Sequence, residues 1–394
     1  MPSDTRREVG RRIAAARRAR RMTQPELAAA AHLSLSMLRK VEQGSRVPGD
    51  GTLGALATAL GVDASRLIED PIRTGGRVRA VLPALSAAIA AYDMSVDTLS
   101  RPLIALEQEA AQAEAYRLGA RYARLATVVT PLVTEAIAAV HGAPGGPDRR
   151  RAARLLVSAA RSADAVAYKF GARDLSARLI EVMRWAAPKA EDPLLLATVG
   201  YVRTETFFTA RAYRAGLRAL EDTIDQSPDA VCLRSTASLG ALHMRAAVIA
   251  GRAGDADAAD THLRDAERLA GSVREGVYGG TAFGPASVRV HRVSVAVSLG
   301  GDHSGSALHV SEAWRAPEEL PAERRSGYHI ELARAQLWAG RADHAFESLQ
   351  EARRIAPQHT REHPWARETA LTLRRLRRAD AEALTSFAKW IGAI

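Results

Sequence analysis

A helix-length segment that closes on proline or glycine recurs five times between residues 171 and 357. Each copy opens with a turn and runs for 17 or 18 residues, and the closing positions lie 40 to 46 residues apart. These closing residues are Pro188, Pro228, Gly271, Pro317 and Pro357. A repeat of this length holds two helices, and a helical pair cannot bury its apolar stripe alone. The pattern therefore predicts that successive pairs stack into an α-solenoid.

The rest of the chain beyond residue 78 also has a helical pattern, in which Ala, Leu and Arg segments alternate with short Gly or Pro breaks. Residues 79–145 predict one or two further helical pairs, and residues 143–150 (APGGPDRR) predict an exposed loop. Residues 71–78 contain a proline and two glycines and predict a linker. We therefore expect an all-α chain with an N-terminal domain at residues 1–70 and a repeat domain at residues 79–394.

A second local pattern, between residues 23 and 44, predicts two short helices joined by a tight turn. Thr23 and Glu26 have the spacing of a capping box at the start of the first helix. Ser34 is placed to cap the second helix. His32 lies in the turn, where we expect a left-handed backbone that histidine tolerates. Apolar residues at helical spacing indicate a preceding helix over about residues 4–21.

The second of these helices has an apolar face and a polar face. Leu38 and Val41 lie at i and i+3, so they are expected to face inward. The outward positions are Leu35, Ser36, Arg39 and Lys40. A pair of helices of this kind places the second helix in the DNA major groove. There, Arg and Lys side chains donate to guanine, and an apolar side chain packs on the methyl group of thymine.

The stretch from Val9 to Leu67 resembles the Cro/C1-type (XRE) helix-turn-helix family. The residues in the register of that family are Gln24, Leu27, Ala28, Ser34, Leu38, Glu42 and Gly44. The resemblance implies a lambda-repressor-like domain of five helices. Its fourth helix would be capped by Thr52 and closed by Gly61, and a short fifth helix would be capped by Asp63. The chain departs from the family at His32, where glycine is usual.

The resemblance also implies roles for single residues. Gln24 would contact a backbone phosphate or the neighbouring base, and Arg46 would contact a phosphate. Arg17 and Glu42 would form a partly buried ion pair that ties the first helix to the third. The expected DNA-binding residues are therefore Gln24, Ser34, Leu35, Ser36, Arg39, Lys40 and Arg46.

The repeats resemble tetratricopeptide repeats, best at residues 239–271 and 328–357, although their spacing exceeds the usual length of about 34 residues. Residues 274–302 interrupt this pattern with a glycine-rich, non-helical loop followed by a helix. The loop resembles a T-x-F-G-P loop found in actinobacterial regulators that join an XRE domain to a helical-repeat domain.

Two interpretations of this interruption remain open. It can line an effector pocket, with the aromatic residues making apolar contacts and the basic residues polar ones. The residues of this pocket would be Tyr278, Phe283, His291 and Arg292. Alternatively, it is a structural loop whose Phe283 fills the gap between two repeats. The second interpretation is favoured, because a buried aromatic residue in a repeat insertion commonly serves packing.

The formal net charge of +11 and the pI near 10.3 favour a polyanionic partner. The basic residues are 51 Arg and 4 Lys, however, and this bias indicates GC-rich codon usage, so the overall pI is weak evidence. Residues 1–49 contain 11 basic and 4 acidic residues, a net charge of +7 that suits phosphate contacts. The chain contains no asparagine, which excludes a site that grips an extended peptide through Asn side chains.

Several other classes of protein are disfavoured. Cys232 is the only cysteine, so the chain can form no internal disulfide, which suits a reducing cytoplasm. We expect Cys232 to be a buried small residue. We find no signal peptide and no run of about 18 apolar residues that would span a membrane. Phosphate-binding loops, nucleophile elbows and zinc-protease motifs do not occur, so neither an enzyme nor a cofactor is expected. His359 and His363 have no third ligand nearby, so no metal site is expected.

The sequence thus predicts a cytoplasmic, effector-responsive transcription regulator that binds double-stranded DNA as a homodimer. Its two recognition helices would read half-sites of a palindromic operator about 34 Å apart, or a multiple of that distance. The repeat domain would dimerise and sense a small molecule, a peptide or a protein. The alternative is an interaction adaptor, in which the repeats recruit a protein partner and the helix-turn-helix only locates it on DNA.

Overall fold

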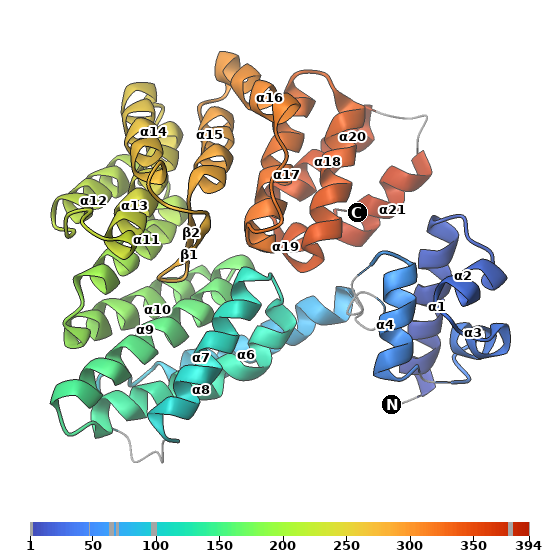
Figure 1. The fold of residues 1–394 in the computed structure, drawn as a ribbon, viewed down its shortest axis with the longest axis horizontal. Helices are drawn as coiled ribbons and strands as arrows, with labels where there is room; N and C mark the ends of the chain where they lie inside the picture. Colours follow the sequence, from blue (N-terminus) through green and yellow to red (C-terminus); the bar gives the residue numbers. More distant parts are fainter. Residues whose placement is uncertain are drawn as a thin grey trace. The chain divides into compact units, whose positions relative to one another are not determined.

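The computed structural model describes residues 3–46, 48–62, 67, 71–95, 101–376 and 381–393. The chain divides into two compact units, residues 1–76 and 77–394. Both units are helical, and the only sheet among the described residues has two short strands (Figure 1). The predicted all-α fold, with a helix-turn-helix domain before a solenoid of helical hairpins, is confirmed.

Unit 1 contains four helices among its described residues: α1 (Ser3–Ala19), α2 (Gln24–Ala30), α3 (Leu35–Glu42) and α4 (Asp50–Ala59). They enclose a small apolar core, whose largest fully buried side chains are Ile13, Leu27, Leu38, Leu56, Leu60 and Leu67. The residues of the predicted fifth helix lie outside the described residues, apart from Leu67. The helix-turn-helix, α2 and α3, therefore packs against apolar side chains of α1 and α4.

Two predicted helix ends in unit 1 have different outcomes. Gly61 adopts a left-handed backbone with φ of 55° just after α4, as expected for a residue that closes a helix. The prediction that Thr52 caps α4 is wrong, because the helix begins two residues earlier at Asp50. Gly49, in an extended conformation, is the N-cap and makes no side-chain hydrogen bond there. A glycine that follows Pro48 turns the chain into the helix before the threonine is reached.

Unit 2 contains the remaining elements. The helices of its first half are α6 (Pro71–Ala88, which begins in unit 1), α7 (Leu103–Leu118), α8 (Tyr122–Gly142), α9 (Gly146–Lys169), α10 (Arg173–Ala186), α11 (Pro193–Ala210), α12 (Tyr213–Asp225), α13 (Leu233–Ala253) and α14 (Ala256–Ala270). The helices of its second half are α15 (Pro285–Leu299), α16 (Ser304–Ala313), α17 (Ala322–Trp338), α18 (Ala342–Ile355), α19 (Pro357–Glu362), α20 (Pro364–Leu376) and α21 (Ala381–Ile391). Short 3-10 helices lie at Ala187–Ala190 and Gly301–His303.

The five repeated segments form α10, α12, α14, α16 and α18, and each packs on the helix before it. The predicted helical pairs are therefore confirmed. At all five pair turns a residue with positive φ follows the first helix, which allows the chain to reverse. These residues are Gly171, Arg211, Gly254, Gly300 and Gly340. Successive pairs then follow one another along unit 2 (Figure 1).

Two predicted irregular segments are helical instead. The expected linker at 71–78 lies in α6, with Pro71 at the first helical position, where its missing N–H costs nothing. The expected loop at 143–150 is also shorter than predicted, because α9 begins at Gly146, with Pro147 in its first turn. In both cases the proline that suggested a break marks a helix start.

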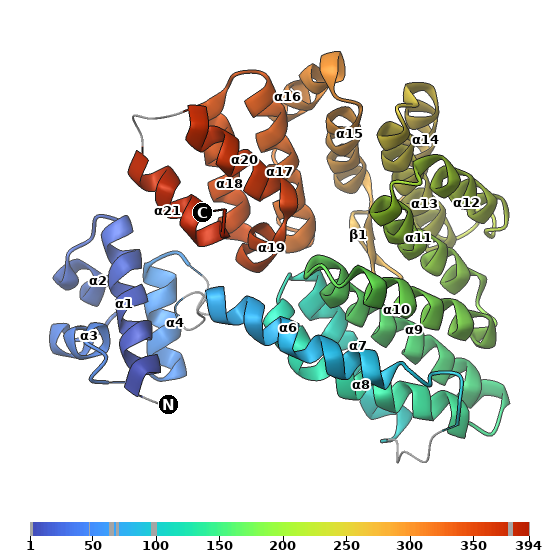
Figure 2. The ribbon, with the colours of Figure 1, turned by 180° about the vertical axis from the view of Figure 1, so that it is seen from behind.

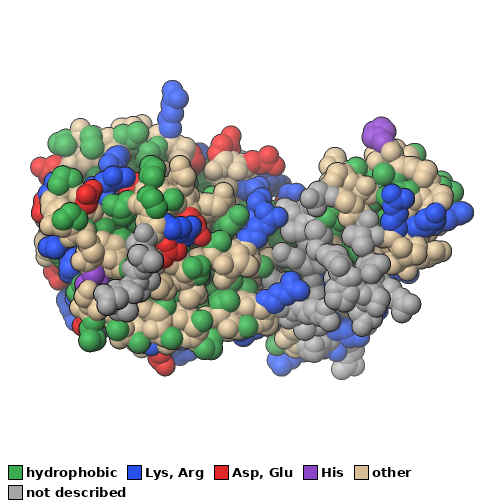
Figure 3. Space-filling model, turned by 90° about the horizontal axis from the view of Figure 1, so that it is seen from below, with side chains coloured by type: hydrophobic (Ala, Val, Ile, Leu, Met, Phe, Trp, Pro, Cys, Tyr) green, Lys and Arg blue, Asp and Glu red, His purple; other side chains and the backbone are tan. Residues whose placement is uncertain are grey.

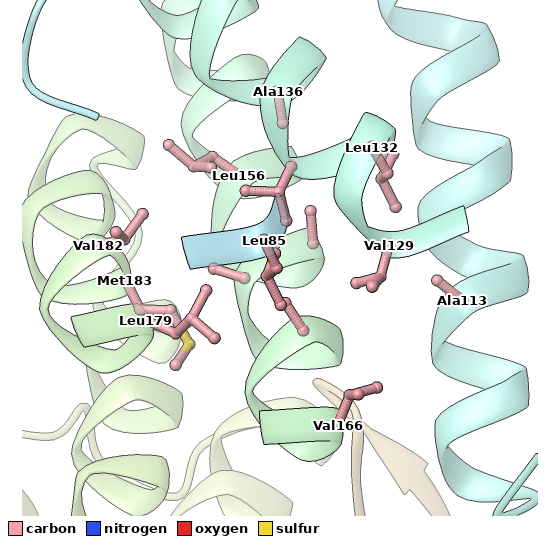
Figure 4. Close-up of a cluster of buried hydrophobic side chains, with 14 of the residues drawn as sticks. Leu85, Ala113, Val129, Leu132, Ala136, Leu156, Val166, Leu179, Val182 and Met183 are labelled. Carbon is pink, nitrogen blue, oxygen red and sulfur yellow. The ribbon is translucent and has the colours of Figure 1, made fainter. Parts of the chain in front are cut away.

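The largest core of unit 2 lies among α6 to α10 (Figure 4). Leu85 of α6 meets Val129 and Leu132 of α8 and Leu156 of α9 there, and all four are fully buried. Helix α8 is long and apolar enough, by length and composition, to cross a membrane, in contrast to the sequence-based expectation. Its buried face supplies nine residues to this core, so its apolar character has a structural use.

The solenoid curves until its last pairs touch its first ones (Figure 2). Lys169 Nζ at the end of α9 lies 2.7 Å from Glu323 Oε1 of α17. The backbone N–H of Ala123 in α8 donates to Gln358 Oε1 of α19 at 3.0 Å. Residues that line the inside of this curve therefore come from helices far apart in sequence.

The interruption at 274–302 begins with a β-hairpin in place of the expected irregular loop, and the expected helix follows as α15. Strands β1 (Gly276–Tyr278) and β2 (Thr281–Phe283) pair in antiparallel fashion, with Tyr278 opposite Thr281. Gly279 and Gly280 form the turn, with φ of 52° and 73°. A Gly-Gly pair between short β-prone runs is a hairpin signal that the sequence does contain. The hairpin extends from α15 toward α7 to α10.

Candidate nucleic-acid interface

Helix α3 is set in place by local capping. Ser34 Oγ accepts a hydrogen bond from the Met37 N–H at 3.2 Å, and Thr23 and Glu26 cap α2 reciprocally. His32 has a φ of 54°, so the left-handed turn predicted between the two helices is present. These three features set the start of α2, the turn and the start of α3 through residues close in sequence.

The outer face of α3 carries the polar residues predicted for it. Ser34, Ser36, Arg39, Lys40 and Arg46 are exposed. Leu35 is half-buried, while Leu38 and Val41 are buried beneath the helix. Lys and Arg side chains are also visible on the face of unit 1 that Figure 3 presents. The geometry is that of a basic helix face available to a polyanion.

A three-residue network fixes α3 to the rest of unit 1. Arg17 Nε lies 2.8 Å from Glu42 Oε1, and the hydrogen bond to Glu42 raises the pKa of Arg17. The predicted ion pair is confirmed, with side-chain exposures of 14% and 6%. Gln24 Nε2 also donates to Glu42 Oε2 at 2.7 Å, a contact that the sequence did not predict. Glu42 thus holds Gln24 at the start of α2, beside the exposed face of α3.

Gly10 is a further structural residue that the sequence analysis missed. A Cβ at this position would lie 2.4 Å from the Val41 carbonyl oxygen and 2.5 Å from that of Glu42. No side chain fits there, so α1 packs directly against the backbone at the end of α3. The signal available in the sequence was a glycine inside a helical pattern, which often marks such a close approach.

Residues 8–67 match a family model described as a helix-turn-helix domain. This segment is a helix-turn-helix domain. The match ends before the solenoid and assigns nothing to it. No curated protein matches the chain.

Three solved structures are similar to the chain at low identity. PlcR of Bacillus thuringiensis, in complex with the peptide PapR7 and DNA, is 14% identical over 67% of this chain and 94% of PlcR, with a TM-score of 0.30. Apo ComR from Streptococcus vestibularis is 12% identical over 98% of this chain and 99% of its own, with a TM-score of 0.30. Apo ComR from S. thermophilus is 12% identical over 97% and 98%, with a TM-score of 0.29.

The structure does not gather the four residues predicted to line an effector pocket. Phe283 is fully buried and its ring lies against Gly240 of α13, where a Cβ would come within 2.0 Å of it. Arg292 points toward α14 and pairs with Glu267. Tyr278 is half-exposed, and its hydroxyl donates to the Arg274 carbonyl at 2.8 Å. The packing interpretation of Phe283 therefore fits its surroundings.

His291 is buried and faces the inside of the solenoid. Its Nε2 lies 2.8 Å from the Arg324 guanidinium, and its Nδ1 lies 2.8 Å from the Ser287 carbonyl oxygen. Because a guanidinium only donates, the imidazole is neutral and carries its proton on Nδ1. Burial, together with the charge of Arg324, holds the pKa of His291 well below its usual value.

A cluster of charged groups that the sequence analysis missed lies inside the curve of unit 2. Its cationic members come from α7, α9, α13 and α17 and are Arg117, Arg161, Lys169, Arg245 and Arg324. Its acidic members are Glu114, Asp164, Glu205 and Glu323. Single arginines within apolar helical runs, such as Arg161 among alanines, were the available signal. We call this set the interior charged cluster.

Burial shifts the ionisation of this cluster. The pKa of Arg161 falls to about 9, because the guanidinium is buried and because Arg117 lies close to it. Burial and Glu205 raise the pKa of Asp164 well above its usual value, and Ser176 Oγ donates to this carboxyl at 2.5 Å. Burial opposes ionisation of Glu323, but the charge and hydrogen bond of Lys169, together with His359 and Arg117, outweigh it and lower this pKa to about 2.

Aromatic rings cover part of the interior charged cluster. The Arg245 guanidinium lies 4.7 Å from the centre of the Tyr201 ring and 5.0 Å from that of Phe208. Arg161 lies on the same Tyr201 ring at 6.0 Å. Among the described residues, no group of three or more His, Cys, Asp or Glu side chains has the geometry to hold a metal ion. The cluster offers charge and hydrogen bonds in place of metal ligands.

Proposed function

We propose that this protein is a cytoplasmic, sequence-specific transcription regulator that binds DNA through α3. Residues 1–70 would form an XRE-type DNA-binding domain, and residues 79–394 a tetratricopeptide-like sensor and dimerisation domain. The observation that supports this proposal best is the exposed face of α3 on a rigid base. Ser36, Arg39 and Lys40 are exposed there, while caps and the Glu42 network fix the helix. Such a pre-set helix reads base edges in the major groove.

Control of DNA binding would come from the solenoid. A signal changes operator affinity only if it binds the two arrangements of the dimer with different affinity. The interior charged cluster is the part of unit 2 best equipped to receive such a signal, because its charges and hydrogen-bond donors face inward from several helical pairs. A small molecule, a peptide or a protein segment are the candidate classes.

Genomic footprinting with the purified full-length protein tests this function. We expect discrete palindromic sites with half-site centres about 34 Å apart, or a multiple of that distance. The Arg39→Ala and Lys40→Ala variants should lose these sites, while a control change on the solvent side of α14, Arg264→Ala, should retain them. Scattered occupancy without a shared motif, unaffected by the α3 variants, would favour an adaptor that recruits a protein partner to DNA.

A further inference from the structure

The tip of the β-hairpin is gripped by two arginines from distant helices. Arg117 of α7 donates from its terminal nitrogen to the Gly280 carbonyl at 2.8 Å. Arg161 of α9 donates to the Gly279 carbonyl at 2.5 Å and to Thr281 Oγ1 at 2.6 Å. The contacts span more than a hundred residues of sequence, so the tip is held by tertiary structure alone.

These two buried arginines form hydrogen bonds with neutral acceptors, which bind a guanidinium more weakly than a carboxylate or phosphate does. The three hydrogen bonds end on two carbonyls and one hydroxyl, all of them uncharged. Arg117 Nε is buried and has no hydrogen-bond partner within the described residues. In the described part of the chain, the one ion pair of these two arginines joins Arg117 to Glu114 at 3.7 Å, and the Glu114 side chain is one-third exposed. Charge-assisted bonds to a carboxylate or phosphate are about twice as strong as bonds to neutral acceptors.

The two guanidiniums also repel each other, since the charge of Arg117 lowers the pKa of Arg161. An oxyanion placed between them would relieve this repulsion and offer two or three charged acceptors. The hairpin turn already occupies that position as closely as the chain allows. A Cβ on Gly280 would lie 2.6 Å from Glu114, 2.8 Å from Arg161 and 2.9 Å from Arg117.

We propose that Arg117 and Arg161 form an oxyanion-binding site in which the hairpin tip acts as an internal stand-in. A ligand that carries a carboxylate or a phosphate displaces the Gly279 and Gly280 carbonyls and binds both guanidiniums. The base of the hairpin stays in place, because Phe283 is buried and Glu275 accepts hydrogen bonds from the Ser287 N–H and hydroxyl at 2.9 and 2.6 Å. Only the turn moves.

This site deepens the proposed sensor function and rests on that function for its biological consequence. The hairpin connects α7 and α9 to α13 and α15. Displacement of its tip breaks this connection. A change in the curvature of unit 2 then follows ligand binding. Anion binding itself can be measured without DNA, so it stands or falls separately from operator recognition.

The test uses the full-length protein at constant ionic strength, with succinate and inorganic phosphate as probes and succinamide as the uncharged control. Binding is followed by calorimetry. Movement of the turn is followed with a fluorophore at Val277→Cys in a Cys232→Ser background, since Val277 is 41% exposed. Binding of succinate alone identifies a carboxylate ligand, and binding of phosphate alone identifies a phosphate ligand.

Two variants should move the affinity in opposite directions. Arg161→Gln should weaken anion binding at least tenfold, because it removes one guanidinium. Thr281→Val should strengthen it about fivefold, because it removes one neutral competitor for Arg161 while keeping the shape of the side chain. The exposed Arg264→Gln on α14 serves as the control and should leave the affinity unchanged.

The outcomes decide the proposal even if Arg161→Gln does not fold, because Thr281→Val predicts a gain. The proposal is overturned if both anions bind the wild type and Thr281→Val no better than succinamide does. It is also overturned if affinity is the same in Thr281→Val as in the wild type. If the wild-type protein binds the anion but no operator, the regulator function is refuted, while the oxyanion-binding site is still supported.

Discussion

The two basic regions of this molecule are built in opposite ways. Helix α3 presents Arg39 and Lys40 to solvent, and its cap, its turn and the Arg17–Glu42 pair, 25 residues apart, hold it. The solenoid keeps Arg117 and Arg161 inside, where their partners lie 163 and 118 residues away in sequence. An exposed cation can bind a polyanion with little desolvation cost. A buried cation has already lost its hydration and needs a partner that the fold places beside it. The exposed face of α3, the outer region, therefore suits a macromolecule, and the buried pair Arg117 and Arg161, the inner region, suits a small ligand.

The largest expected effect is on the stability of unit 2, and it tests whether the inner region is held together by the hairpin. Phe283→Ala should lower the free energy of unfolding of unit 2 by about 3–5 kcal/mol, because a fully buried ring is removed beside Gly240. Urea denaturation followed by tryptophan fluorescence measures this, since all five tryptophans lie in unit 2: Trp185, Trp314, Trp338, Trp365 and Trp390. Tyr278→Phe is the control and should cost far less. If both variants lose the same free energy of unfolding, the buried Phe283 ring does not anchor the hairpin.

The next effect concerns acid, which should destabilise unit 2 selectively. Burial lowers the pKa of His359 to about 3, with Lys169 adding to the shift, and burial lowers those of His243 and His329 to about 4. The unfolded chain binds protons on these residues below about pH 6.5, while the folded chain does not. Stability is therefore full above pH 6.5 and falls as the pH drops toward these folded values.

His359→Gln checks this account. Between pH 6.5 and 4 each such histidine contributes a slope of up to about 1.4 kcal/mol per pH unit, so the variant should show a slope smaller by about one proton. Urea midpoints of unit 2 measured across this range provide the slope. His344→Gln, an exposed change on α18, should leave it unaltered. A slope that His359→Gln does not change would contradict the burial of a neutral imidazole.

A smaller effect is expected on the outer region, at the DNA contacts. Lys40→Ala should cost about 1–3 kcal/mol of binding free energy on the operator and relax its specificity, because Lys40 is proposed to read a base edge. Arg46→Ala should weaken binding to all sequences alike, as the loss of a phosphate contact does. Fluorescence anisotropy with operator and scrambled duplexes separates the two. Uniform losses for both variants would show that Lys40 does not read bases.

The smallest effect sharpens the claim that α3 is positioned locally. Ser34→Ala should destabilise unit 1 by about 1 kcal/mol, since Ser34 Oγ accepts the Met37 N–H. Ser36→Ala, two residues further along the same helix, has no cap to lose and should cost almost nothing. Hydrogen exchange of the α3 amides reports both. Faster exchange in Ser36→Ala than in Ser34→Ala would contradict the capping role.

The outer region could be predicted from sequence because its determinants are local. The Thr23–Glu26 capping box, the cap at Ser34 and the left-handed His32 lie within a few residues of what they shape. The helical pairs were predictable for the same reason, since their closing prolines and glycines mark helix ends. Gly10 and the Gln24–Glu42 hydrogen bond were not predicted, because each depends on which helices pack together.

The inner region could not be predicted in this way. Nothing near Arg161 in the sequence points to a carbonyl at Gly279, because the two meet only when the solenoid curves. The four residues proposed as an effector pocket were grouped by nearness in sequence, but their neighbours differ. Phe283 packs on α13, Arg292 pairs with α14, and His291 contacts Arg324 of α17. The Gly-Gly turn was the one local signal, and it indicates the hairpin but not what holds its tip.

The central claim is that α3 reads DNA sequence. The most direct measurement is the ratio of affinities for the footprinted operator and for random DNA of the same length, taken with full-length protein at 0.15 M salt. We expect the operator to bind at least about a thousandfold more tightly, and Lys40→Ala to reduce this ratio. Equal affinity for both duplexes would contradict it.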